Sequence, residues 1–299
     1  MKPQSSLSAD FLLLAAVWGS SFLFMRLGAL EFGAWSTAGL RIGIAALALV
    51  PLLLLRCDLQ LVRRKAIPLL LIGMLNTGIP FALYCYALQH ISTGLTSILN
   101  ASAPLFGALV AWIWLREAPN RWRLLGLALG FVGIILLSWH KVSTGSEQTG
   151  WAVLACLGAT LCYGISASGT RKYLNGVPPL AITSASLIGA ALLLALPTAW
   201  YWPSQTPGLS AWGALLVLGL ACTAWAYVLF YRLIAQAGPA KALTVTFMVP
   251  LFALLYGALL LGEPVTPAMI GYGLVILFGV ALSTEFIQPG RWLKRQARP

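Results

Sequence analysis

Polar side chains recur on single helix faces inside the long apolar runs of this chain. Asn76 and Tyr84 lie eight residues apart, and Thr223 and Tyr227 lie four apart, so each pair shares one side of a helix. Amide, hydroxyl and phenol groups arranged in this way can hydrogen-bond a small solute. They do not place a nucleophile beside a base or gather several acids, which hydrolysis or metal chemistry would require. The pattern predicts recognition of a solute, with no catalytic residue, cofactor or metal site.

Equivalent stripes in other apolar runs predict the lining of one central cavity, since polar groups inside a membrane usually face a bundle interior or water. The candidate binding residues are Trp18, Ser21, Arg41, Asn76, Tyr84, Asn100, Tyr163, Ser166, Trp225, Tyr227 and Thr246. For any single serine or threonine, a hydrogen bond that joins two helices is the competing interpretation. The recurrence of the stripes at equivalent positions favours the cavity for the set.

Three of these residues, two tryptophans and an arginine, are open to more than one interpretation. Trp18 and Trp225 fall near mid-span, so each either packs against neighbouring helices or presents its ring to an apolar or cationic solute. Arg41 is the only cation clearly within a span. It could bind a substrate carboxylate through two hydrogen bonds, extend to the headgroups, or hold carbonyls at a kink. The sequence leaves these alternatives open.

Two prolines and two acids occupy matching positions near the ends of apolar runs. Pro104 and Pro250 each remove a backbone hydrogen bond, so they are candidate hinges. Kinks inside a static bundle are the alternative. Glu117 and Glu263 lie in turns before later runs, where a carboxylate favours a helix N-terminus. We expect them to cap the helices that follow them rather than to couple transport to an ion.

Composition places the whole chain in a membrane. Of 299 residues, 60% are hydrophobic and only 9% are charged, with a mean hydropathy of +0.87, whereas charged residues make up about a quarter of soluble domains. About 20 apolar residues cross the bilayer as a helix. The predicted transmembrane helices are residues 9–27, 35–55, 67–88, 94–115, 123–139, 151–171, 179–201, 211–232, 241–261 and 267–285.

The chain repeats itself with a shift of 146 residues. Pro104-Leu105-Phe106 matches Pro250-Leu251-Phe252, and the match runs without a gap to Glu117 and Glu263. Near the start of each copy the shift is 145 residues, which aligns Trp18 with Tyr163 and Arg26 with Arg171. We therefore expect two repeats, residues 1–145 and residues 146–299. Each repeat contains five spans, an odd number, so the second copy must cross the membrane in the opposite direction. The expected fold is all-α, with ten transmembrane helices in two inverted five-helix repeats around a central cavity, as in secondary transporters.

Lysine and arginine predict the orientation of the chain. Of the 19 such residues, 16 fall on the side of the N-terminus and two, Arg26 and Lys141, fall on the other side, while Arg41 is the remaining one. Positive residues favour the cytoplasmic side, so both termini are expected in the cytoplasm.

Several other function classes do not fit. The net charge of +12 comes from short basic clusters between apolar runs, which is typical of cytoplasmic loops and not of nucleic-acid binding. The five cysteines are odd in number and lack CxxC spacing, so neither a disulfide framework nor a zinc site is predicted. The chain also has no GxxxxGK[ST] loop for ATP.

The residues quoted above resemble one known family. Trp18-Gly19-Ser20-Ser21-Phe22, Arg41, and the Pro-Leu-Phe motif with its following glutamate in both halves are similar to EamA-type members of the drug/metabolite transporter superfamily. The resemblance implies export of a small organic solute across a bacterial inner membrane, and amino-acid exporters of the YddG type are the preferred neighbours. Tyr163 stands where the first repeat has Trp18, and Leu187 where it has Arg41, so the site should be asymmetric.

The favoured hypothesis is a secondary transporter that exports small amphiphilic metabolites, such as amino acids, aromatic ones included, or related amines, by alternating access. Its expected partners are a small-molecule substrate and the lipid bilayer, with no nucleic acid, and the chain acts as a monomer or homodimer. An intramembrane enzyme for a lipid or prenyl substrate is the alternative, and it predicts a cluster of acids or histidines at one membrane face. A scaffold or channel subunit is a third possibility.

Overall fold

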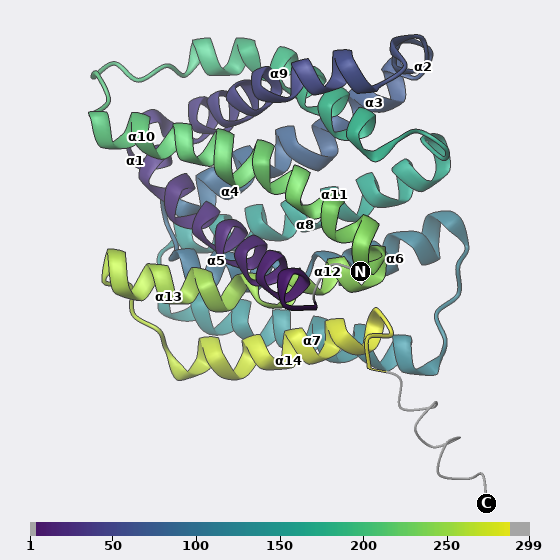
Figure 1. Cartoon of the computed structure of the whole chain (residues 1–299). Helices are drawn as coiled ribbons and strands as arrows, with labels where there is room; N and C mark the ends of the chain where they lie inside the picture. Colours follow the sequence, from purple (N-terminus) through teal and green to yellow (C-terminus); the bar gives the residue numbers. More distant parts are fainter. Residues whose placement is uncertain (1–3, 288–299) are drawn as a thin grey trace, which may run out of the picture.

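The computed structural model describes residues 4–287, and every regular element in that range is a helix (Figure 1). Eight helices are long and apolar enough to cross a membrane, and a shorter apolar helix ends the described chain. The first of the eight contains two spans, because Gly33 has φ 75° and ψ 173° and reverses the chain between them. The ten predicted spans and the all-α fold are therefore confirmed.

The first repeat begins with α1 (Gln4–Arg56), which holds the first two spans, and the short helix α2 (Leu59–Arg64). The third span consists of α3 (Ala66–Gly73), the π-helix η1 (Met74–Gly78) and α4 (Ile79–Leu88). The fourth consists of α5 (Thr93–Asn100) and α6 (Ala103–Leu115), and the fifth is α7 (Arg121–Thr144).

The second repeat follows the same plan. Its first two spans are α8 (Glu147–Tyr173) and α9 (Pro179–Trp200). The third consists of α10 (Leu209–Gly219), the π-helix η2 (Leu220–Trp225) and α11 (Ala226–Ala237). The fourth consists of α12 (Pro239–Leu243), the 3₁₀ helix η3 (Thr244–Phe247) and α13 (Val249–Leu261), and α14 (Pro267–Ser283) is the fifth.

The two repeats pack through equivalent contacts. Gly19 of α1 meets Phe252 of α13, and Gly164 of α8 meets the backbone of Phe106 in α6, so closely that a Cβ on either glycine would overlap its neighbour. Helices α7 and α14, the last of each repeat, lie side by side (Figure 1). Because α1 with α13 and α7 with α14 join opposite repeats, the two copies share one core. The fold is two inverted five-helix repeats around a central cavity.

An even number of spans places both ends of the described chain at one face of the molecule. We call it the terminal face, at the right of Figure 1, and the other the opposite face. Large apolar side chains such as Leu55, Leu192 and Leu209 are exposed around the bundle, as a bilayer requires. Five of the cations counted for the predicted orientation lie outside the described residues: Lys2, Arg291, Lys294, Arg295 and Arg298.

Candidate functional site

A cavity of about 1460 Å³ lies where the two repeats meet. Its wall contains nine of the residues that the sequence predicted as binding residues, together with one of the two candidate hinges. These lining residues are Trp18, Ser21, Arg41, Asn76, Tyr84, Asn100, Pro104, Tyr163, Tyr227 and Thr246. They come from α1, η1, α4, α5, α6, α8, α11 and η3, so no single helix carries the site.

The two π-helices decide which residues of the third and eighth spans face the cavity. The cavity wall contains Asn76 of η1, Phe81 five residues after Asn76, and Tyr84 three residues after Phe81. The second repeat places Cys222 and Tyr227 at the same spacing. A π-turn contains an additional residue, which rotates the helix that follows. Asn76 and Tyr84 therefore share the cavity side as predicted, whereas Thr223 does not lie in the wall with Tyr227, and Phe81 and Cys222 were missed.

Trp225 is not in the cavity, because a residue two positions before Tyr227 points to the other side of the helix. The Trp225 side chain lies at the end of η2 and is 44% exposed on the outside of the bundle. Ser166 of α8 is also absent from the wall, and it is 1% exposed among packed helices. The prediction that Trp225 and Ser166 line the cavity was therefore wrong.

The candidate hinges lie at interruptions of their spans rather than within continuous helices. Pro104 follows the break between α5 and α6 and reaches the cavity. Pro250 follows η3 at the start of α13 and is buried outside the wall. Each proline is near a helix N-terminus, where its missing N–H leaves no intrahelical bond unmade. Their action as hinges stays a prediction.

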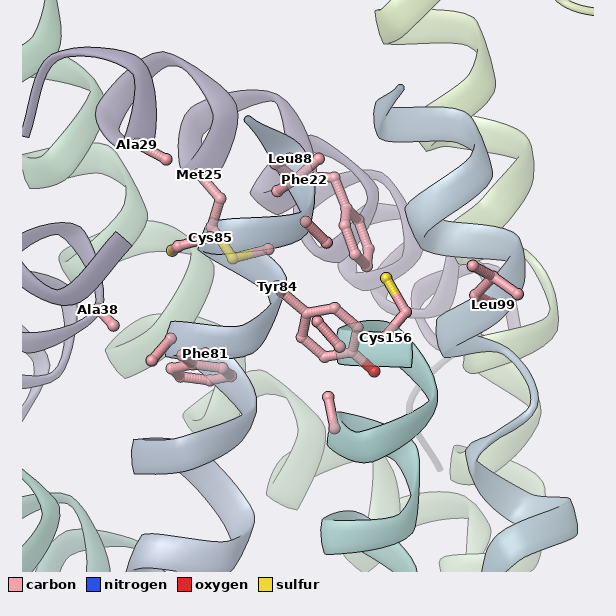
Figure 2. Packing of buried hydrophobic residues seen from close by; sticks show 14 of the residues in the cluster. Phe22, Met25, Ala29, Ala38, Phe81, Tyr84, Cys85, Leu88, Leu99 and Cys156 are labelled. Atoms are coloured by element: carbon pink, nitrogen blue, oxygen red, sulfur yellow. The ribbon is translucent and has the colours of Figure 1, made fainter. Parts of the chain in front are cut away.

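Tyr84 organises one side of the cavity. Its hydroxyl donates to Oδ1 of Asn100 at 2.8 Å, which ties α4 to α5. Figure 2 shows the Tyr84 ring extending from α4 toward Cys156 and below Phe22, whose ring it meets edge to face at 6.1 Å. The Tyr163 ring lies 6.1 Å away on the cavity side. The repeat shift could have identified part of this aromatic wall, because Tyr84 matches Phe230, which also lines the cavity.

Arg41 enters the cavity wall from the second span. Only 4% of the residue is exposed, so it does not extend to the membrane surface. Its Nε donates to Oγ1 of Thr223 at 2.9 Å, and Nη1 lies 3.1 Å from Sδ of Met25. The guanidinium carbon lies 3.7 Å from the centre of the Phe81 ring, a cation–π contact. Neither of the atoms that accept from it carries a charge.

All seven acidic side chains of the chain have other partners. They pair as Asp10 with Arg232, Glu31 with the Gly208 N–H, Asp58 with the first turn of α2, Glu117 with Arg171, Glu147 with Trp151, Glu263 with Arg26, and Glu285 with Arg123. The described part of the chain holds no group of three or more histidines, cysteines and acids that could bind a metal ion. The enzyme alternative predicted such a cluster, so it gains no support.

The cavity reaches the terminal face. Lys241 and Leu243 of α12 and Glu285 after α14 belong to its wall and lie at that face. On the opposite side α5 covers it, with residues Thr93–Leu99 all buried. Leu243 of the second repeat is 53% exposed, whereas its repeat equivalent, Ser97, is fully buried. Equivalent segments thus differ between the repeats, and the difference opens the cavity toward one face.

One ion pair joins the two repeats at each face of the molecule. At the opposite face Arg26 lies 3.3 Å from Glu263, whose carboxylate also accepts from the N–H and the hydroxyl of Thr93 at 2.9 and 2.7 Å. At the terminal face Arg171 lies 2.6 Å from Glu117. The repeat shift relates the two pairs. The glutamates join the two repeats, and Glu263 caps α5, instead of capping the helices that follow them.

The comparisons with known proteins agree with this architecture. The model of the EamA-like transporter family matches residues 8–139 and residues 150–284. A crystal structure that is 18% identical aligns with a TM-score of 0.65 over 98% of this chain and all of its own, which supports the fold alone.

Three relatives are similar over most of their length. The uncharacterized transporter YoaV of Bacillus subtilis is 25% identical, covering 90% of this chain and 93% of YoaV. The uncharacterized inner membrane transporter YedA of Escherichia coli K12 is 28% identical, covering 91% and 88%. A Chlamydia trachomatis protein named S-adenosylmethionine/S-adenosylhomocysteine transporter is 26% identical, covering 86% and 83%. With the family model matched in both halves of the chain, this multi-pass membrane protein belongs to the EamA-like transporter family.

Proposed function

We propose that this transporter exports small amphiphilic metabolites, amino acids with an aromatic side chain foremost among them, by alternating access. The observation that carries the proposal is the cavity of about 1460 Å³ between the repeats, with aromatic rings and a few polar groups in its wall. Such a wall suits a solute with an apolar body and a polar head, because scattered polar groups orient a ligand that apolar surface holds.

The proposed export would begin from the conformation seen here, in which the cavity is open at one face. The cavity reaches the terminal face, and we propose that this face is cytoplasmic because the basic clusters of the sequence lie on it. A solute would load from the cytoplasm and leave after the opposite face opens. We further propose that residues 1–145 and residues 146–299 act as the two moving repeats, in a bacterial inner membrane, as a monomer or homodimer.

One relative supports the class of solute. The Chlamydia protein is named for S-adenosylmethionine and S-adenosylhomocysteine, and both molecules join an amino-acid group to an aromatic base. This chain is 26% identical to it, so the shared feature that we carry over is an amphiphile with an amino-acid head, not those two compounds.

Counterflow of labelled amino acids in liposomes tests the proposal, and the chain offers a matched pair of variants. Trp18→Ala removes an indole from the cavity wall, and Trp225→Ala removes an indole from the outside of the bundle. We expect Trp18→Ala to abolish transport or change its selectivity, and Trp225→Ala to transport like the unchanged protein. Absence of counterflow across a broad amino-acid panel would refute the substrate class, and an equal reduction in both variants would refute the cavity as the route.

A further inference from the structure

The buried guanidinium of Arg41 lacks an anionic partner within the protein. Two of its five N–H groups have acceptors, the Thr223 hydroxyl and the Met25 sulfur, and both acceptors are neutral. All seven acidic side chains are engaged elsewhere, as described above. A cation taken out of water is costly unless it is paired and hydrogen-bonded. An anion in the cavity would therefore stabilise this arrangement by compensating the charge.

The surroundings hold the guanidinium in one orientation. The Thr223 hydroxyl donates to the Leu218 carbonyl at 2.8 Å, so its lone pairs remain for Nε of Arg41. The Phe81 ring covers one face of the guanidinium plane. The N–H groups left over, on Nη1 and Nη2, therefore serve the cavity that Arg41 lines. A fixed planar fork of N–H donors matches the geometry of a carboxylate better than that of any neutral acceptor.

We propose that Arg41 is the anion-recognising residue of this transporter, and that its solutes must carry a carboxylate that binds the free N–H groups. The proposal rests on the proposed function and narrows it, because it excludes amines that lack an acid group. The second repeat has Leu187 at the equivalent position. Lys241, the other cation of the wall, lies at the terminal face. Arg41 is therefore the anion-binding group of the inner part of the cavity, and a solute binds there in one direction.

Distances along α1 indicate where the rest of the solute lies. Met25, in contact with Arg41, and Trp18 both line the cavity on the same helix, and seven residues of helix rise about 10 Å. The Trp18 ring packs 5.2 Å from the Phe230 ring, which also lines the cavity. A carboxylate at Arg41 would thus allow an aromatic side chain to reach these two rings.

Three probes that share a phenyl ring separate the possibilities: phenylalanine with both charged groups, 3-phenylpropionate with the carboxylate alone, and 2-phenylethylamine with the amine alone. Each is tested as a competitor of labelled amino-acid counterflow by the full chain in liposomes. We expect the two carboxylates to compete at least about tenfold more strongly than the amine, which corresponds to one good charged contact. Equal competition by the amine would overturn the proposal while leaving the proposed function intact, whereas failure of all three would refute the aromatic amino-acid class instead.

Variants locate the effect at Arg41. Arg41→Gln should weaken the competition by both carboxylates by about tenfold or more and leave the competition by the amine unchanged. Arg41→Lys should retain part of the preference for carboxylates. Lys141→Gln removes a positive charge outside the cavity and should leave the competition by all three probes unchanged. Thr223→Val retains the charge but removes the Nε acceptor, so it should weaken the carboxylates by a smaller factor.

Two further results would decide against the proposal. If Arg41→Gln retained the preference for carboxylates, another group would be responsible. If replacing chloride by gluconate abolished transport, a resident chloride rather than the substrate would compensate Arg41. Should Arg41→Gln fail to fold, as judged by gel filtration, the three probes on the unchanged protein still decide the matter.

Discussion

Glu263→Gln should shift the transporter toward a state open at the opposite face. Glu263 holds that face closed, because its carboxylate, only 9% exposed, contacts Arg26 of α1 and two donor groups of Thr93 in α5. The buried segment that begins at Thr93 is the repeat equivalent of residues 239–245 at the terminal face, where Lys241 and Leu243 are exposed. If the repeats exchange conformations during transport, these bonds must break. Glutamine has the same shape as glutamate but no charge. The substitution therefore weakens only the closed state, in which these bonds exist.

The size of the shift between the two states follows from the hydrogen bonds that the Glu263 carboxylate makes, because a neutral amide would make them weaker. A hydrogen bond to a charged group contributes about 1.5–3 kcal/mol. The Arg26 side chain is 26% exposed and keeps its bonds to the Leu88 and Ile91 carbonyls, so the ion pair adds little. We expect a cost of about 2 kcal/mol, which changes the ratio of the two states about thirtyfold. A minor state populated at about 1% would rise to about a quarter.

Labelling of one cysteine measures this population. Thr246→Cys places a thiol in the cavity wall, and the five native cysteines are replaced. A membrane-impermeant thiol reagent, added at the opposite face, then reacts only with molecules open to that side. Glu263→Gln should raise the rate about 25-fold, in proportion to the population.

A matched control comes from the first repeat. Glu117→Gln removes the equivalent carboxylate at the terminal face, where the Glu117 side chain is 38% exposed and the Arg171 side chain 66%. An exposed ion pair contributes about 0–1 kcal/mol, and its removal should not open the opposite face. An unchanged labelling rate in Glu263→Gln, or an equal increase in Glu117→Gln, would refute the reasoning.

Three further substitutions test the geometry. Gly33→Ala puts a side chain at φ 75° and ψ 173°, a region that almost only glycine adopts, with open space around it. Only backbone strain of about 1–3 kcal/mol should therefore lower the thermal stability in detergent; an unchanged melting temperature would argue against the reversal at this residue. Tyr84→Phe removes the bond to Asn100 and should cost about 1 kcal/mol of stability, with a matching change in solute affinity by calorimetry. Gly279→Ala places a Cβ 2.5 Å from the Gly130 nitrogen and should destabilise the α7–α14 packing by about 1–3 kcal/mol, measured by chemical denaturation against Gly271→Ala, where the space is open.

Hydropathy and repetition were sufficient for the architecture. The length of a span depends on the thickness of the bilayer, so each transmembrane helix could be predicted from its own apolar residues. The duplicated Pro-Leu-Phe motif and an odd number of spans per copy then required the inverted arrangement. Polar side chains in the middle of spans, such as Asn76 and Asn100, were recognised as cavity residues because burying them against lipid would be too costly.

Only the tertiary structure decided which side chains face the cavity beyond the π-turns and which residues pair between repeats. Hydropathy does not reveal the additional residue of a π-turn, so Phe81 and Cys222 were missed. Arg26 and Glu263 lie far apart in the sequence, and neither repeat alone contains the ion pair. The open face was also beyond the sequence, because two nearly equivalent repeats allow both conformations, and small differences in packing choose between them.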